Sequence, residues 1–180
     1  MTPLAGTANF GRNHLWQWVF CVVDRCLVAL RSGGRGCGTT VLSMTVRVVL
    51  VDDHEMVIEG LKAMLAPFGD RVEVVGEAVG AEKAMAVIVD LQPDIVLCDV
   101  RMQGASGLDL CREIRKRDPP QRKVILLSVY DDEQYLFQAM RVGASGYLLK
   151  GISSDELVRQ LEGVHAGSTA IDAGLAARAA

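Results

Sequence analysis

From Val46 onward, apolar residues recur along the chain with two different spacings. Five runs are short, apolar and rich in β-branched residues, namely 46–51, 72–75, 95–98, 124–127 and 146–149. The segments that follow them carry apolar residues at helical spacing, namely 55–66, 81–91, 108–117, 132–142 and 154–166. The pattern therefore predicts five strands, each followed by one helix.

The single helix in each gap determines how the strands pair. Adjacent parallel strands need a long crossover connection, which a helix supplies, and such crossovers are right-handed. Pro67, Pro93 and the pair at 119–120 follow the expected helix ends, where a missing N–H is tolerated. Five such units predict an α/β fold, a doubly wound domain built on a five-stranded parallel sheet.

Composition limits the protein to one globular core. The chain has 180 residues, half of them apolar and 23% charged, with a net charge of −3. These values exclude a wholly disordered or collagen-like chain. The charge is unevenly divided, because residues 1–43 carry four arginines and one aspartate whereas the remainder carries 15 basic and 21 acidic residues. An acidic domain is poorly suited to bind nucleic acid by itself.

The first 43 residues differ in kind from the rest. The apolar run 15–30 is interrupted by Asp24 and Arg25, so it is too short to span a bilayer, and no membrane association is expected. We expect residues 1–43 to be an N-terminal extension, either disordered or an upstream-start artefact with Met44 as the natural start. The five cysteines show no metal-ligand spacing, and their odd number without a secretion signal indicates reduced thiols and a cytoplasmic location.

Polar residues end four of the five apolar runs. Asp52 and Asp53 follow the first run, Asp99 the third, Ser128 the fourth and Lys150 the fifth. Carboxyl ends of parallel strands lie at one edge of a sheet, where ligands bind in such folds. Taken singly, each residue could cap a helix, stabilise a turn or point to water.

Together these residues indicate a binding site. Three carboxylates in one place repel each other unless a cation neutralises them. Oxygen ligands without histidine or cysteine suit Mg²⁺, which binds one or two carboxylates together with phosphate oxygens. A lysine and a hydroxyl beside a nucleophilic carboxylate are suited to phosphoryl transfer. No phosphate-binding GxxxxGK[ST] loop is present, so the phosphate would not arrive on a bound nucleotide.

Four segments carry a family resemblance that covers about residues 46–166. LVDDHEMV, IVLCDVRMQGASG, VILLSVY and GASGYLLK, in this order, resemble the receiver domain of two-component response regulators, and in particular the NarL/FixJ (LuxR-type) subfamily. The resemblance implies a flavodoxin-like (βα)5 receiver at 44–167 and the start of an interdomain linker at 168–180. It also implies a phosphoacceptor signalling domain rather than an enzyme, one that assists its own phosphorylation and dephosphorylation.

The resemblance assigns a role to each site residue. Asp99 would accept the phosphoryl group, assisted by Lys150 and by Ser128, which is also the switch hydroxyl. Tyr147 would be the switch aromatic, which can turn inward after phosphorylation. The metal ligands would be Asp52, acting mainly through water, and Asp53, Asp99 and the backbone carbonyl of Arg101.

Two positions depart from the family pattern without removing a group that contacts metal or phosphate. Gln103 stands where a proline usually follows methionine, and Gly151 stands after the lysine. A magnesium-dependent phosphatase is the weaker interpretation, because it would need a second acid at position 101, where the chain has arginine.

The resemblance also implies partners. A sensor histidine kinase would supply the phosphoryl group, and phosphorylation could drive homodimer formation. DNA would be bound only through a helix-turn-helix output domain, for which residues 168–180 are too few. Two functions therefore stay open: the input half of a transcriptional regulator, or a stand-alone receiver that docks a protein or takes part in a phosphorelay.

Overall fold

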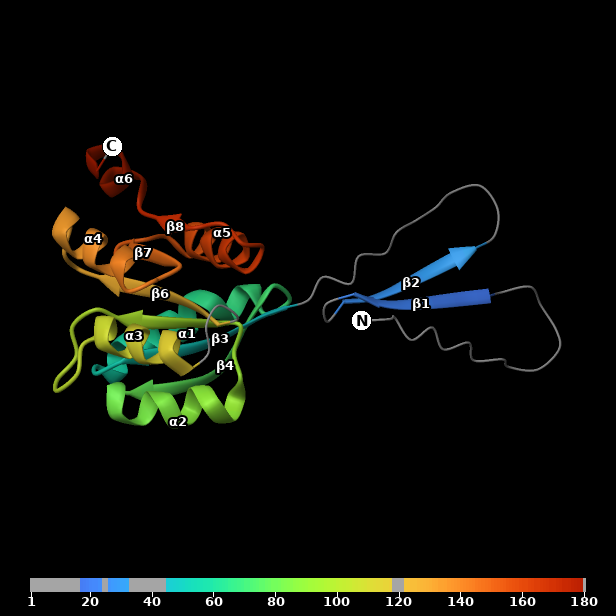
Figure 1. Ribbon diagram of the computed structural model, residues 1–180, viewed down its shortest axis with the longest axis horizontal. Coiled ribbons are helices and arrows are strands. Elements are labelled where there is room, and N and C mark those ends of the chain that lie inside the picture. The colour runs from blue at the N-terminus through green and yellow to red at the C-terminus, as the bar shows by residue number, and fades with distance from the viewer. Residues whose placement is uncertain (1–16, 24–25, 33–44, 118–121, 180) are drawn as a thin grey trace. The chain divides into compact units, whose positions relative to one another are not determined.

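The computed structural model describes residues 17–23, 26–32, 45–117 and 122–179 (Figure 1). The chain divides into two compact units, 1–44 and 45–180. In the first unit, β1 (Gln17–Val23) and β2 (Cys26–Ser32) pair antiparallel in unbroken register. The rest of the expected extension lies outside the described residues.

The second unit alternates strands and helices as predicted. Its elements are β3 (Val46–Asp52), α1 (Glu55–Leu65), the 3-10 helix η1 (Ala66–Phe68), β4 (Val72–Val79), α2 (Ala81–Leu91), β5 (Ile95–Asp99), α3 (Gly107–Arg117), β6 (Lys123–Ser128), α4 (Glu133–Arg141), β7 (Gly146–Leu149), α5 (Ser154–His165), β8 (Ala170–Ile171) and α6 (Ala173–Ala179). The strands form one parallel sheet in the order β4-β3-β5-β6-β7-β8. The prediction of a doubly wound parallel α/β domain is confirmed.

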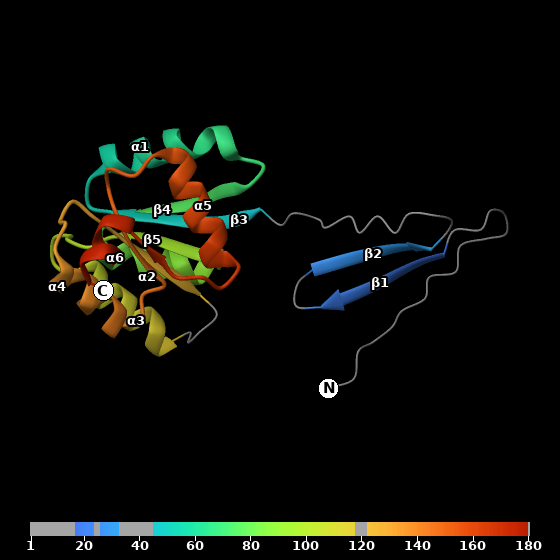
Figure 2. The same ribbon diagram turned by 90° about the horizontal axis from the view of Figure 1, so that it is seen from above.

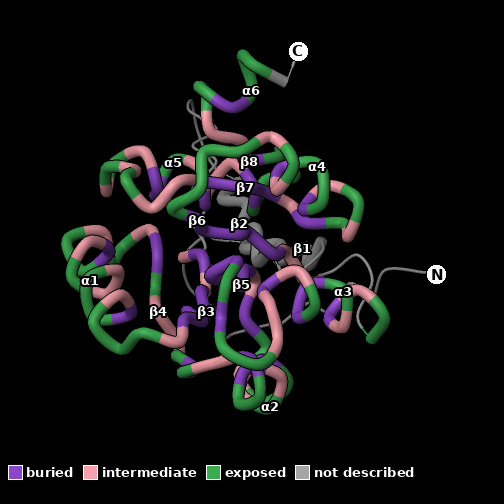
Figure 3. Tube along the Cα trace, turned by 90° about the vertical axis from the view of Figure 1, so that its left-hand side faces the viewer, coloured by how far each residue is buried: buried purple, intermediate pink, exposed green. Residues whose placement is uncertain are grey.

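Helices cover both faces of this sheet. Figure 3 shows α1 and α5 on one face and α2, α3 and α4 on the other. Each face carries its own cluster of buried apolar residues, so central strands such as β5 are buried on both sides. Burial on both sides explains why the strands appear in the sequence as continuous apolar runs rather than alternating ones.

The predicted strand number of five is wrong, because β8 adds a sixth strand at the edge. β8 has only two residues, too few to give a periodic signal, and it pairs with β7 through Gly146 and Ala170. A Cβ on Gly146 would lie 2.7 Å from the Ala170 Cβ, so this close pairing requires glycine. The interval 168–180, where a linker start was expected, therefore contains β8 and α6 in the structure.

β4 is longer than its apolar run. It continues from the predicted end at Val75 to Val79, and its pairing with β3 shifts between Val48 and Val49, which leaves Val75 as an extra residue. Gly76 and Glu77, which are poor strand formers, concealed this continuation. None of the helices in the described part of the chain is both long and apolar enough to cross a membrane.

Close packing at the start of α3 gives a testable prediction. A Cβ on Gly107 would lie 2.0 Å from the backbone oxygen of Asp99 and 3.0 Å from the Cys98 Sγ. We expect Gly107→Ala to lower the free energy of unfolding by about 1–3 kcal/mol, as measured by urea denaturation. Gly60→Ala is the matched control, because nothing lies within 4 Å of its Cβ and alanine favours the helix by about 0.5–1 kcal/mol. Equal stability of the two variants would contradict the close approach.

Candidate functional site

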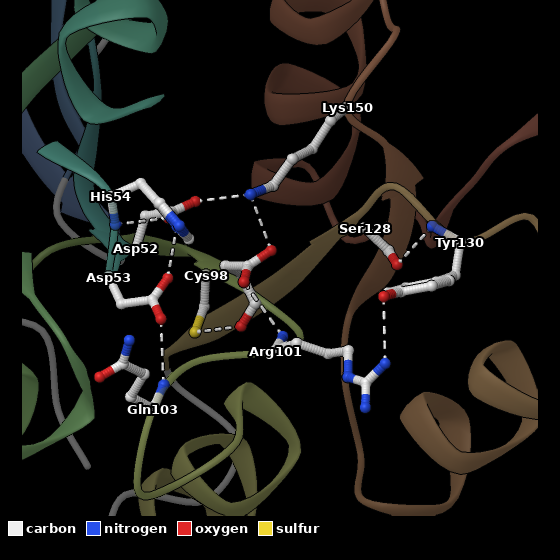
Figure 4. A network of polar contacts seen from close by, with 10 residues as sticks. Asp52, Asp53, His54, Cys98, Arg101, Gln103, Ser128, Tyr130 and Lys150 are labelled. Carbon is white, nitrogen blue, oxygen red and sulfur yellow. Dashed lines mark hydrogen bonds and ion pairs between the residues drawn. The ribbon is translucent and has the colours of Figure 1, made fainter. Parts of the chain in front are cut away.

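The sheet topology places the predicted polar residues at one edge. Asp52 is the last residue of β3, Asp99 of β5 and Ser128 of β6, and Lys150 directly follows β7. Figure 4 shows Asp52, Ser128 and Lys150, which come from different elements, gathered at this edge. Asp52, Asp99 and Ser128 are the buried polar residues of the core among the described residues.

Lys150 joins two of the carboxylates. Its Nζ lies 2.7 Å from Oδ2 of Asp52 and 2.8 Å from Oδ1 of Asp99 (Figure 4). The second oxygen of Asp99 accepts a hydrogen bond of 3.1 Å from the backbone amide of Arg101. The ammonium group therefore offsets part of the repulsion between two buried acids.

Burial and pairing shift the pKa values of this pair. Burial raises the pKa of Asp99 above its usual range, although the hydrogen bond and the charge of Lys150 act in the opposite direction. Burial alone would lower the pKa of Lys150, but its hydrogen bonds to Asp52 and Asp99 outweigh that cost and raise it. Lys150 therefore remains a cation beside Asp99 at neutral pH.

Asp53 lies next to this pair and has one oxygen without a hydrogen bond. Its Oδ2 accepts from the backbone amide of Gln103 at 3.0 Å, whereas its buried Oδ1 has no hydrogen-bond partner. The Nδ1 of His54 lies 2.7 Å from that Oδ1 and forms an ion pair with it only when protonated. Ligand atoms of Asp52, Asp53 and His54 all lie within 4.8 Å of one another. A buried carboxylate oxygen that has no hydrogen-bond partner, beside a second carboxylate, fits a hard divalent cation.

Ser128 is held by the loop that follows it. Its Oγ accepts a hydrogen bond of 2.9 Å from the backbone amide of Tyr130. Asp132, rather than Ser128, caps α4 by accepting from the amide of Gln134. The hydroxyl proton of Ser128 is thus not committed to the helix and can be donated within the site.

The structure shows Tyr147 already turned inward. Its side chain is completely buried, and its hydroxyl donates to the backbone oxygen of Tyr130 at 2.9 Å. The inward orientation that we expected to follow phosphorylation is therefore present in this structure. It ties β7 to the loop between β6 and α4.

Arg101 and Tyr130 form a bridge beside Asp99. The Arg101 guanidinium donates to the Tyr130 hydroxyl oxygen at 3.0 Å and lies 5.2 Å from the centre of its ring. The two side chains come from the loops after β5 and β6, and both are exposed to solvent. Figure 4 shows the Arg101 side chain reaching to the Tyr130 hydroxyl.

Three contributors to the site were not identified from the sequence. The amide of Gln103 orients Asp53, the amide of His54 donates to Asp52 at 2.9 Å, and Gly107 lets α3 approach the end of β5. Backbone donors leave no signature in residue types, so only Gly107 could have been suspected. His54 itself is the exposed N-cap residue of α1.

Comparisons with known proteins agree with this geometry. The family model of the response regulator receiver domain matches residues 48–162, well over half of the chain. The chain is 38% identical over 130 residues to the transcriptional regulatory protein MctR of Rhizobium johnstonii, covering 72% of the chain and 60% of MctR. It is 42% identical over 127 residues to the DNA-binding transcriptional activator DevR/DosR of Mycobacterium tuberculosis, covering 71% of the chain and 58% of that protein.

A solved structure gives the same result. The chain resembles a two-component response regulator of the LuxR family from Aurantimonas sp. SI85-9A1, with 32% identity and a TM-score of 0.70 over 76% of this chain and 96% of that one. The chain thus spans less than two thirds of the two curated relatives but nearly all of the solved one. The chain belongs to the response regulator receiver domain family, within its NarL/FixJ (LuxR-type) subfamily.

Proposed function

We propose that Asp99 is the phosphoacceptor of this receiver and takes a phosphoryl group from the phosphohistidine of a sensor kinase. One observation carries the proposal: the Lys150 ammonium lies 2.8 Å from Oδ1 of Asp99 and 2.7 Å from Oδ2 of Asp52. A permanent cation held against a nucleophilic carboxylate, with a second acid beside it, is the arrangement that phosphoryl transfer needs.

Asp99, Lys150 and Ser128 would have different roles in the transfer of the phosphoryl group. A carboxylate oxygen of Asp99 forms a bond to phosphorus while the phosphorus–nitrogen bond to the kinase imidazole breaks. The nitrogen keeps the electron pair, and solvent supplies any proton it gains. Lys150 offsets negative charge on the transferred group, and Ser128 can donate its hydroxyl proton to a phosphoryl oxygen.

The acidic residues would hold Mg²⁺. The proposed ligands are Asp53 and Asp99, the backbone carbonyl of Arg101, and Asp52 acting through water. The buried Oδ1 of Asp53, which lacks a hydrogen-bond partner, supports this assignment. When bound, the ion supplies the positive charge that three neighbouring carboxylates and a phosphoryl group require.

The proposed signalling role also involves other proteins. We propose that the domain acts as a cytoplasmic signalling component rather than an enzyme with an external product, although it assists its own phosphorylation and dephosphorylation. Its partners would be a sensor histidine kinase and a second copy of itself after phosphorylation. Transcriptional control would require a DNA-binding output domain; the relative DevR/DosR is named as a DNA-binding transcriptional activator.

Phosphorylation of Asp99 can be tested directly. Incubation with Mg²⁺ and acetyl phosphate should add one phosphoryl group to the wild-type protein, detected by intact mass, and none to Asp99→Asn. Asp90→Asn is the matched control, because this exposed acid lies at the end of α2, outside the site, and should leave the adduct unchanged. An adduct on Asp99→Asn as large as that on the wild type would place the acceptor elsewhere.

The metal assignment predicts a selective loss of affinity. Asp53→Asn should weaken Mg²⁺ binding by about tenfold or more in calorimetric titration, since even groups behind direct ligands are worth about that much. The amide of Gln103 can still donate to the remaining carbonyl oxygen, so the loop should keep its position. Unchanged Mg²⁺ affinity in Asp53→Asn would remove Asp53 from the ligand set.

The bridge beside Asp99 should protect the phosphorylated state. We expect the combined Arg101→Ala and Tyr130→Ala substitutions to speed loss of radiolabelled phosphate several-fold, because water then reaches the phosphorus more easily. Both hydrogen bonds that Tyr130 makes to Ser128 and Tyr147 use its backbone, so the loop should persist. Arg112→Ala, which breaks only an exposed ion pair with Asp109, is the control. The same decay rate in all three proteins would refute the protective role.

A further inference from the structure

The C-terminal segment is bound back onto the domain. The backbone amide of Asp172 donates to the oxygen of Tyr147 at 3.1 Å, immediately after β8 pairs with β7. The carboxylate of Asp172 then accepts from the amides of Gly174 and Leu175, which fixes the first turn of α6. Leu175 is completely buried. The short helix is therefore anchored by packing and not only by chain connectivity.

α6 is seated against α4. Figures 1 and 2 both show it beside α4 at the end of the sheet that β8 forms. Leu175 belongs to the same buried apolar cluster as Leu136 and Ala139 of α4 and Tyr147 of β7. Tyr147 is the residue whose hydroxyl holds the loop between β6 and α4. The helix thus shares its apolar contacts with the elements next to the phosphorylation site.

An ion pair adds a second attachment at the same loop. The Arg178 guanidinium contacts Asp131, and its Nε lies 3.9 Å from Oε1 of Glu133. Asp131 lies between β6 and α4, and Glu133 is the first residue of α4. The loop therefore has Ser128, beside the phosphoacceptor, at one end and the contacts to α6 at the other.

We infer that α6 is a latch on the loop between β6 and α4, and that it opposes the rearrangement which phosphorylation of Asp99 requires. The inference rests on the proposed function. A shift of Ser128 toward a phosphoryl group displaces the following residues, including Asp131, and so weakens the hold of Arg178. Because such coupling is reciprocal, loosening the latch strengthens binding of a phosphoryl group by the same factor.

The test compares the affinity of three proteins for beryllofluoride, a phosphoryl mimic, in the presence of Mg²⁺. Arg178→Ala should bind it about two- to fivefold more tightly than the wild type, the range that one exposed ion pair supports. Arg159→Ala is the matched control, because it breaks an exposed ion pair with Glu156 on α5, away from the loop, and should match the wild type. Amide hydrogen exchange of residues 173–179 in the wild type should also accelerate when beryllofluoride binds.

The outcomes separate the two proposals. Equal or weaker binding by Arg178→Ala, with normal binding by the wild type, overturns the latch and leaves Asp99 as the acceptor. Unchanged exchange at residues 173–179 on binding overturns it as well. If the wild-type protein does not bind beryllofluoride at all, the proposed function fails, and the latch fails with it.

Discussion

The ammonium group of Lys150 makes it possible for two carboxylates to be buried at one edge of the sheet. Each buried ion costs several kcal/mol in lost hydration unless a partner of opposite charge lies close by. Lys150 meets this requirement for both Asp52 and Asp99, at 2.7 and 2.8 Å. The order of the parallel strands is what brings the end of β7 within reach of β3 and β5. The fold of the sheet and the geometry of the site therefore both depend on the order of the strands.

The charge of the site remains unbalanced after this pairing. Three carboxylates face one lysine, and the exposed ring of His54 can offset more charge only when protonated. Asp53 keeps one buried oxygen without a hydrogen bond. A bound cation would neutralise this excess negative charge. Its positive charge would in turn attract a phosphoryl group. The electrostatics thus show how the proposed Mg²⁺ ion would let an acidic domain bind the proposed phosphoryl group.

The loop after β6 connects this chemistry to the surface. Its backbone contacts Ser128 and Tyr147, its Tyr130 side chain contacts Arg101, and its Asp131 contacts Arg178 of α6. Apart from the contact with Ser128, these contacts join residues at least 17 positions apart in the chain. The ring of Tyr147, which bonds to this loop, and the side chain of Leu175 are both buried in the core cluster on that face. A change at Asp99, the proposed phosphoacceptor, would therefore reach the C-terminal helix through these contacts.

The sequence by itself determined the alternation of five strands and helices and the polar residues at the strand ends, because burial on both faces of a parallel sheet leaves continuous apolar runs. It also supported the assignment of Asp99 and Lys150 through their motifs. Only the tertiary structure decided the sixth strand, the inward position of Tyr147 and the position of α6 beside α4. A two-residue strand has no periodicity, and the amide donors of His54 and Gln103 carry no residue-type signal. The contact between the Gln103 amide and Asp53 also depends on the distance between segments 50 residues apart in the chain, which a linear pattern does not contain.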